Sequence, residues 1–221
     1  MTFIKICGIR DVEQVPALAE AGADFIGVMF APSPRQVTRA QARKISDAAK
    51  ETKKPPQIVG VFVNTPASTI RETVEICKLD RVQLSGDEPW GFCRELDMPI
   101  IKVIRVGRNY TAEQIYTDLE YGDRVLEHQE HIFQLDANVR DKYGGTGMRF
   151  DWKLAVPIAE RLPVVLAGGL TPDNVKEAIR LVRPWGVDVS SGVETEGVKD
   201  MSKIMKFIEN VRKADSGLHR A

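Results

Sequence analysis

The chain has 221 residues, and 31 Lys plus Arg are balanced by 31 Asp plus Glu, so its formal net charge is zero. Hydrophobic residues make up 43% and charged residues 28% of the sequence, which is typical of a soluble globular protein. A neutral chain whose C-terminal basic residues are few (Arg212, Lys213 and Arg220) does not support electrostatic capture of nucleic acid. The length alone fits either two small domains or one α/β barrel.

The cysteines and the uncharged stretches indicate the compartment. Cys7, Cys77 and Cys93 are too few and too scattered for a disulfide framework, and no two are spaced as a Cys-x-x-Cys metal pair. The longest uncharged stretches, residues 25–34 and 162–172, fall short of the roughly 18 apolar residues that a membrane span needs. With no recognisable signal peptide, we expect a cytoplasmic protein without a membrane partner.

Short apolar runs alternate with amphipathic stretches along the chain, which predicts strands alternating with helices. The expected strand and helix pairs are residues 3–7 and 12–21, 25–30 and 38–50, 58–63 and 66–78, 82–84 and 88–96, 100–106 and 112–119, 132–135 and 151–161, 164–166 and 172–182, and 187–189 and 199–212. Such alternation favours a parallel sheet, because each return to a parallel neighbour needs a crossover. Eight pairs of about 28 residues each predict one (β/α)8 TIM barrel domain over residues 1–221, although spacing alone leaves an open doubly wound sheet possible.

In such a barrel the catalytic groups lie at the carboxyl ends of the strands. Cys7 ends the first strand and faces the mouth by the two-residue period, although most free cysteines are small buried hydrophobic residues. Asp136 ends the sixth strand, where an aspartate often only forms a turn or caps a helix. The connection that follows, residues 137–150, is long and contains three glycines, as binding loops and lids often do.

Glycine-bearing turns follow the seventh and the eighth strands. The first contains Gly168 and Gly169, and the second contains Ser190, Ser191 and Gly192. Backbone N–H groups in such turns approach anions closely, and barrels commonly bind phosphate at these two loops. Glycine also serves any tight turn, but the two turns together favour a phosphate site.

An arginine in the loop after the second predicted strand is a further candidate at the barrel mouth, whereas the histidines lie elsewhere. Arg35 follows Pro32 and Pro34, which stiffen its loop, and its guanidinium suits a substrate carboxylate. His128 and His131 flank the start of the sixth strand, at the wrong end of the barrel for catalysis. Neither a metal site nor a pair of catalytic carboxylates is indicated, so we expect no cofactor.

Eight short motifs are individually distinctive and cover nearly the whole chain. They are Lys-Ile-Cys-Gly-Ile at 5–9, Gly-Val-Phe-Val-Asn at 60–64, Val-Gln-Leu at 82–84, Leu-Asp at 135–136, Tyr-Gly-Gly-Thr-Gly at 143–147, Phe-Asp-Trp at 150–152, Ala-Gly-Gly-Leu at 167–170 and Asp-Val-Ser-Ser-Gly-Val-Glu at 188–194. In this order and spacing the sequence resembles phosphoribosylanthranilate isomerase, a small barrel enzyme of tryptophan biosynthesis. One departure is Ser85, which stands where many relatives carry His, and we leave it outside the catalytic set.

The resemblance implies an Amadori rearrangement of N-(5-phosphoribosyl)anthranilate to 1-(2-carboxyphenylamino)-1-deoxyribulose 5-phosphate, without a redox cofactor or metal. It implies that Cys7 is the general base, that Asp136 is the general acid and that Arg35 holds the anthranilate carboxylate. The turns at 168–169 and 190–192 are then expected to bind the phosphate. For these roles we expect the pKa of Asp136 to lie above ~3.9. The ordinary thiol pKa of ~8.5 is close enough to neutral pH for Cys7 to act as a base.

Three other functions stay open. The analogous isomerase of histidine biosynthesis uses aspartates at the ends of strands one and five, where this chain has Cys7 and Arg105. A Schiff-base aldolase would use Lys5 or Lys102. A non-catalytic module would bind a phosphorylated ligand on the same fold. As for the oligomeric state, either a monomer or a homodimer fits the sequence.

Overall fold

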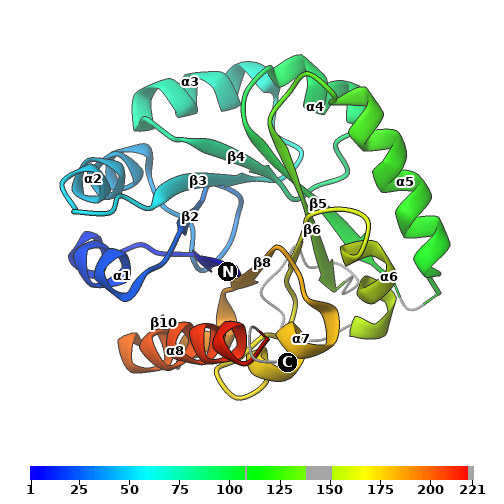
Figure 1. The fold of residues 1–221 in the computed structure, drawn as a ribbon. Helices are drawn as coiled ribbons and strands as arrows, with labels where there is room; N and C mark the ends of the chain where they lie inside the picture. The colour runs from blue at the N-terminus through cyan, green and yellow to red at the C-terminus, as the bar shows by residue number, and fades with distance from the viewer. Residues whose placement is uncertain (108, 138–150, 219–221) are drawn as a thin grey trace.

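The computed structural model describes residues 1–107, 109–137 and 151–218. Within these residues, eight parallel strands form a closed barrel in chain order, with β1 pairing with both β2 and β8 (Figure 1). The strands are β1 (Phe3–Cys7), β2 (Phe25–Met29), β3 (Gln57–Phe62), β4 (Arg81–Leu84), β5 (Ile100–Val106), β6 (His131–Ala137), β7 (Val164–Leu166) and β8 (Gly186–Val189). The predicted TIM barrel is therefore confirmed.

Helices surround the barrel on its outside (Figure 1). The α-helices are α1 (Val15–Ala21), α2 (Arg39–Lys50), α3 (Ala67–Cys77), α4 (Trp90–Leu96), α5 (Ala112–Val125), α6 (Val156–Ala159), α7 (Val175–Val182) and α8 (Met201–Leu218). Short 3-10 turns precede α1 and α6, and a third, η3 (Ser191–Val193), follows β8. Capping boxes begin α2 at Thr38 and α5 at Thr111, where the threonine accepts a backbone N–H and a glutamine side chain returns the bond. None of the described helices is long and apolar enough to cross a membrane.

Several elements differ from the predicted pattern. The helix expected over residues 151–161 is a 3-10 turn, η2 (Trp152–Ala155), followed by the short α6, and α7 begins at Val175 rather than at residue 172. Helix α5 continues past residue 119 to Val125, because Gly122 extends its buried stripe by packing against the ring of Trp90. The last helix begins at Met201 rather than at residue 199, because a hairpin of β9 (Glu194–Thr195) and β10 (Val198–Lys199) precedes it. The two turn residues of this hairpin, Glu196 and Gly197, have positive φ angles of 52° and 78°, as in the type I′ turns that join short antiparallel strands.

The interior of the barrel changes character along its axis. Toward the amino-terminal ends of the strands it contains an apolar layer formed by Phe25, Val59, Ile101, Ile132 and Val165. Toward the carboxyl ends the buried side chains are polar, and they include Lys5, Gln83, Gln134 and Asp188. A buried charge is costly unless it is paired, so this layer has to be internally matched.

Candidate active site

A cavity of about 830 Å³, including its open mouth, lies at the carboxyl ends of the barrel strands. All eight strands contribute to its wall, either directly or through the residues that follow them. The lining includes every site residue predicted from the sequence: Cys7, Arg35, Asp136, Gly168, Gly169, Ser190, Ser191 and Gly192. The structure thus brings all of these residues to one place.

Cys7 is the last residue of β1, and its side chain is buried at the cavity wall. Burial raises the pKa of its thiol, because the thiolate loses its hydration. The positive charges of Lys5 and Lys199 oppose this rise, whereas Asp188 adds to it. The net pKa lies above the ordinary value of 9.0, so the thiol is harder to ionise than the sequence alone suggests.

Asp136 comes near the end of β6 and faces the same cavity. Burial and the neighbouring Asp188 carboxylate raise its pKa to about 6, against weaker opposing effects of the Ala137 N–H, Lys5 and Arg105. The Ala137 N–H donates to its Oδ1 atom at 2.8 Å, which fixes the direction of the carboxyl group. The predicted rise in the pKa of Asp136 is confirmed.

A buried ion pair lies at the seam where β1 meets β8. The Lys5 Nζ atom is 3.0 Å from Asp188 Oδ1, and Gln134 Nε2 donates to Asp188 Oδ2 at 3.0 Å. Burial lowers the pKa of Lys5, but the Asp188 carboxylate overcomes this effect and the pKa lies above its ordinary value. A paired, protonated lysine is a poor Schiff-base nucleophile. Lys102 is likewise buried and paired, with its Nζ atom 2.9 Å from Glu88 Oε2, so neither lysine favours the aldolase alternative.

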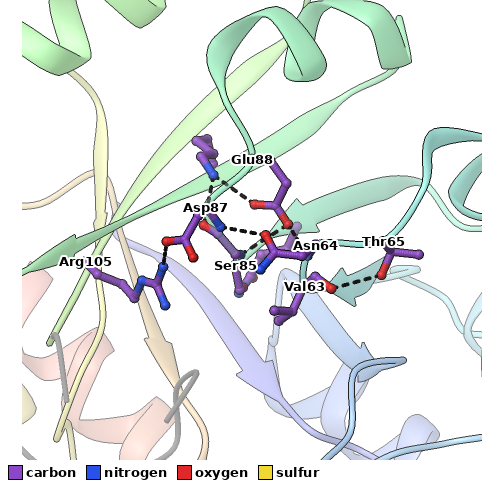
Figure 2. Close-up of polar contacts among 10 residues, drawn as sticks. Val63, Asn64, Thr65, Ser85, Asp87, Glu88 and Arg105 are labelled. Carbon is purple, nitrogen blue, oxygen red and sulfur yellow. Dashed lines mark hydrogen bonds and ion pairs between the residues drawn. The ribbon is translucent and has the colours of Figure 1, made fainter. Parts of the chain in front are cut away.

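The wall near β3, β4 and β5 is tied together by one buried carboxylate. Glu88 Oε1 accepts the backbone N–H groups of Asn64, at 2.7 Å, and of Gly86, at 3.2 Å. Figure 2 shows how these bonds hold the loops after β3 and β4 beside Arg105, which forms an ion pair with Asp87. The side chain of Ser85, which lines the cavity, is therefore presented from an ordered loop.

The turns after β7 and β8 pack directly against each other. Gly168 and Gly169 have φ angles of 84° and 66°, which are unfavourable for other residues. Asn174 Nδ2 donates to the Gly169 carbonyl at 2.9 Å and so fixes this turn. A Cβ atom at Gly192 would collide with the carbonyl oxygen of Leu170, so only glycine allows the two turns to approach this closely.

Arg35 is held by a partner that the sequence analysis did not name as a site residue. Its Nε and Nη2 atoms lie 2.6 and 2.7 Å from the two carboxylate oxygens of Glu194, and Lys199 Nζ lies 2.7 Å from the same carboxylate. Glu194 and Asp188 belong to the motif at 188–194, which is the signal that was available for them. Lys199 carried no such signal, because the periodicity assigned it to a helix.

Two further expectations concern the connection after β6 and the histidines. Residues 138–150 lie outside the described part of the chain, so the interpretation of this connection as a binding loop or a lid stays a prediction. The ring nitrogens of His131 lie 2.8 Å from the Gln129 carbonyl oxygen and 3.0 Å from Asp123 Oδ1, at the start of β6 and away from the cavity. Among the described residues, no group of three or more His, Cys, Asp and Glu side chains is placed to hold a metal ion.

Comparison with known proteins relates the chain to one family of enzymes. The family model for N-(5'-phosphoribosyl)anthranilate (PRA) isomerase matches residues 4–210. The isomerase of that name from Dehalococcoides mccartyi is 44% identical over 215 residues, covering 97% of this chain and 98% of the relative. Its counterpart from a Roseiflexus species is 44% identical over 220 residues, covering 97% and 99%.

Solved structures agree with this relationship. The phosphoribosyl anthranilate isomerase of Thermotoga maritima superposes with a TM-score of 0.78 and 38% identity, covering 96% of this chain and all of that one (100%). A phosphoribosyl anthranilate isomerase in complex with reduced 1-(o-carboxyphenylamino)-1-deoxyribulose 5-phosphate superposes with a TM-score of 0.76 and 37% identity, with the same coverage of 96% and 100%.

The raised pKa of Asp136 has a consequence for stability. Because its pKa rises from 3.8 to about 6 on folding, the folded chain binds this proton more tightly than the unfolded chain does. Ionisation therefore destabilises the fold as the pH rises through this interval, by up to about 3 kcal/mol once it is complete. We expect Asp136→Asn to be more stable than the parent at pH 8, with the difference vanishing near pH 4, as measured by urea unfolding.

Asp200 provides a matched control of opposite sign. Hydrogen bonds from Ser202, Thr195 and Lys203 lower its pKa to about 2, so its ionised form stabilises the fold above pH 4 and this contribution is lost as the pH falls toward 2. Asp200→Asn should therefore be less stable than the parent at pH 8. A stability difference for Asp136→Asn that is the same at pH 4 and pH 8 would contradict the raised pKa.

Proposed function

Because the chain belongs to the N-(5'-phosphoribosyl)anthranilate isomerase family, we propose that the cavity at the carboxyl mouth of its barrel is where the reaction of this family takes place. The chain is an isomerase of tryptophan biosynthesis, and it catalyses the Amadori rearrangement of N-(5'-phosphoribosyl)anthranilate to 1-(2-carboxyphenylamino)-1-deoxyribulose 5-phosphate. One observation carries the assignment of residues: a thiol from β1 and a carboxyl from β6 line the same cavity, together with an arginine and two glycine-bearing turns.

Asp136 is the general acid of the first step. Opening the furanose ring breaks the bond between C1 and the ring oxygen, and the leaving oxygen needs a proton while the anilino nitrogen forms a protonated imine. A carboxyl group with a pKa of about 6 is protonated in a useful fraction of molecules near neutrality, which an ordinary aspartate is not. The raised pKa supports this role.

Cys7 is the general base of the second step. The protonated imine acidifies the C2–H bond, and transfer of that proton to the thiolate gives an enolamine, which tautomerises to the aminoketose. Burial makes the Cys7 thiolate scarce, but it also leaves the thiolate poorly solvated and strongly basic once it forms. The positive charges of Lys5 and Lys199 support the ionised form.

The two anionic ends of the substrate have separate binding places. The turns at Gly168–Gly169 and Ser190–Gly192 offer backbone N–H groups and the start of η3 to the phosphate. Arg35 lies on the cavity wall with its guanidinium plane fixed, and it takes the anthranilate carboxylate. Holding both ends places C1 and C2 between Cys7 and Asp136, which supplies the positioning that the chemistry requires.

The compartment and the oligomeric state of the enzyme are also proposals. All three cysteines are free thiols, as expected in the reducing cytoplasm. The T. maritima relative is described as dimeric, and for this chain a monomer or a homodimer stays a prediction. The histidine-biosynthesis alternative lacks support in the cavity, where the end of β1 presents a cysteine and the end of β5 presents Arg105.

Removal of either reacting group tests the central assignment. We expect Cys7→Ser and Asp136→Asn each to lower kcat by at least about 100-fold with little change in KM, because each group acts on the transition state rather than on binding. Steady-state kinetics with the phosphoribosyl substrate measures both constants. Cys77→Ser and Asp123→Asn make matching changes away from the cavity and should keep normal turnover. Normal turnover in either cavity variant would remove that residue from its role.

The pH dependence of kcat/KM should show a flat region between two limbs. As the pH rises above about 6, the loss of protonated Asp136 is balanced by the gain of Cys7 thiolate. Below about pH 6 Asp136 is protonated, so kcat/KM falls with falling pH as the Cys7 thiolate becomes scarcer. Above the pKa of Cys7, which is higher than 9.0, the thiol is ionised, so kcat/KM falls with rising pH as protonated Asp136 becomes scarcer. Rate measurements across this range check the shape, with the ionisation of the substrate phosphate determined separately by phosphorus NMR. A single optimum at pH 7 with steep limbs on both sides would contradict the two pKa values.

The phosphate site predicts competition by inorganic phosphate. In Gly192→Ala the added methyl group collides with the Leu170 carbonyl and spreads the two turns, so we expect KM and the inhibition constant for phosphate to rise together, each by at least about tenfold. Gly91→Ala, at a helical position with open space around it, is the matched control. Indifference of the parent enzyme to high phosphate would count against the two turns as the anion site.

A further inference from the structure

Three charged side chains, Arg35, Glu194 and Lys199, form a buried cluster on the rim of the cavity, and Arg35 is the one among them that is proposed to bind the substrate. Arg35 and Glu194 meet through two hydrogen bonds of 2.6 and 2.7 Å, and Lys199 Nζ lies 2.7 Å from Glu194 Oε1. Their side chains are 16%, 6% and 5% exposed. A cluster desolvated to this degree is specifically built rather than a chance surface contact.

The hairpin after β8 explains how Lys199 reaches this place. In the register of β9 and β10, Lys199 is directly paired with Glu194, so the two side chains lie next to each other on the same face of the hairpin. Lys199 also donates to the Ser190 carbonyl at 2.8 Å, within the turn assigned to the phosphate. The cluster therefore links the loop that carries Arg35 to the turn that follows β8.

The cluster carries a net positive charge. One guanidinium and one ammonium share one carboxylate, which leaves a net charge of +1. Burial alone would raise the pKa of Glu194, but the hydrogen bonds from Arg35 and Lys199 lower it, so the carboxylate stays ionised. Burial lowers the pKa of Lys199 below its ordinary value, and the Glu194 carboxylate opposes that effect only in part.

Cys7 experiences this charge together with those of other elements. The charged groups near it are Lys5 on β1, Arg35 after β2, Asp136 on β6, Asp188 on β8 and Lys199 on β10. Lys5 is already neutralised by Asp188 at 3.0 Å. The surplus positive charge on this side of the cavity thus comes from the cluster around Glu194.

We infer that Glu194 and Lys199 are positioning residues of the isomerisation: Glu194 fixes the guanidinium of Arg35 at the cavity wall, and Lys199 keeps surplus positive charge beside Cys7. The inference rests on the proposed roles of Arg35 and Cys7. It assigns different tasks to the two residues, so their variants must behave differently.

The charge task is tested with Lys199→Met and Glu194→Gln. Loss of the ammonium makes the Cys7 thiolate harder to form, so in Lys199→Met the alkaline limb of kcat/KM moves to higher pH by at least about half a unit. Loss of the carboxylate leaves both cations uncompensated, so in Glu194→Gln the same limb moves to lower pH. Lys199→Arg, which restores the charge, returns the limb toward that of the parent.

The positioning task is tested with Glu194→Asp. This variant keeps the negative charge but withdraws the carboxylate by one methylene, so it cannot hold Arg35 in the same two-bond geometry. KM should rise at least about fivefold while the alkaline limb and kcat stay close to those of the parent. Lys206→Met removes a lysine from an exposed ion pair with Asp173 and should change neither KM nor the alkaline limb.

A second readout separates this inference from the proposed function. The rate of alkylation of Cys7 by iodoacetamide, followed by peptide mass spectrometry without substrate, reports its ionisation directly. Opposite shifts of this titration in Lys199→Met and Glu194→Gln are expected, and shifts that are absent or of the same sign overturn the inference even if Cys7→Ser is inactive. If instead Cys7→Ser keeps full turnover, the proposed role of Cys7 is wrong. The alkylation shifts then still test whether Lys199 and Glu194 set the ionisation of Cys7. If Lys199→Met does not fold, Glu194→Gln and Lys199→Arg decide the outcome.

Discussion

The ion pair between Lys5 and Asp188 is the constraint on which the cavity depends. It joins the first strand to the last at the register where the barrel closes, in an interior where either charge alone would be strongly destabilising. Its two members act in opposite directions on the reacting groups: Lys5 lowers and Asp188 raises the pKa of both Cys7 and Asp136. Because the pair is neutral as a unit, burial dominates, and both reacting groups hold their protons more tightly than they would in water.

That environment suits the acid and opposes the base. A raised pKa keeps Asp136 partly protonated near neutrality, whereas the same desolvation makes the Cys7 thiolate scarce. Protonated acid with thiolate carries the same total charge as carboxylate with thiol, so the productive form differs from the common one only in where a single proton resides. A positive charge near Cys7 but farther from Asp136 is what shifts this distribution, and Lys199 acts on Cys7 in this sense.

The sequence was sufficient for the parts of the molecule that follow from periodicity. The eight strands and the positions of Cys7 and Asp136 at strand ends derive from apolar runs that alternate with amphipathic stretches, and burial of these runs fixes the register. Spacing favoured a closed barrel but left an open sheet possible. The partners within the polar layer could not be derived in this way. Lys199 was assigned to a helix because two strands of two residues each are too short to leave a periodic signal. The hold of Glu194 on Arg35 depends on two loops 159 positions apart, which no local pattern reports.

The division of labour between strands and loops explains where these hidden partners occur. Cys7 and Asp136 belong to strands, and the hydrogen bonds of the barrel already fix their directions. The groups proposed to recognise the substrate belong to loops, which have no such ladder, and each loop is instead tied down by one side chain. Glu88 joins the loops after β3 and β4, Asn174 closes the turn after β7, and Glu194 joins the loops after β2 and β8. Recognition on loops therefore requires a second set of polar residues beside those that bind the substrate, and in this barrel the two carboxylates of that set, Glu88 and Glu194, are buried.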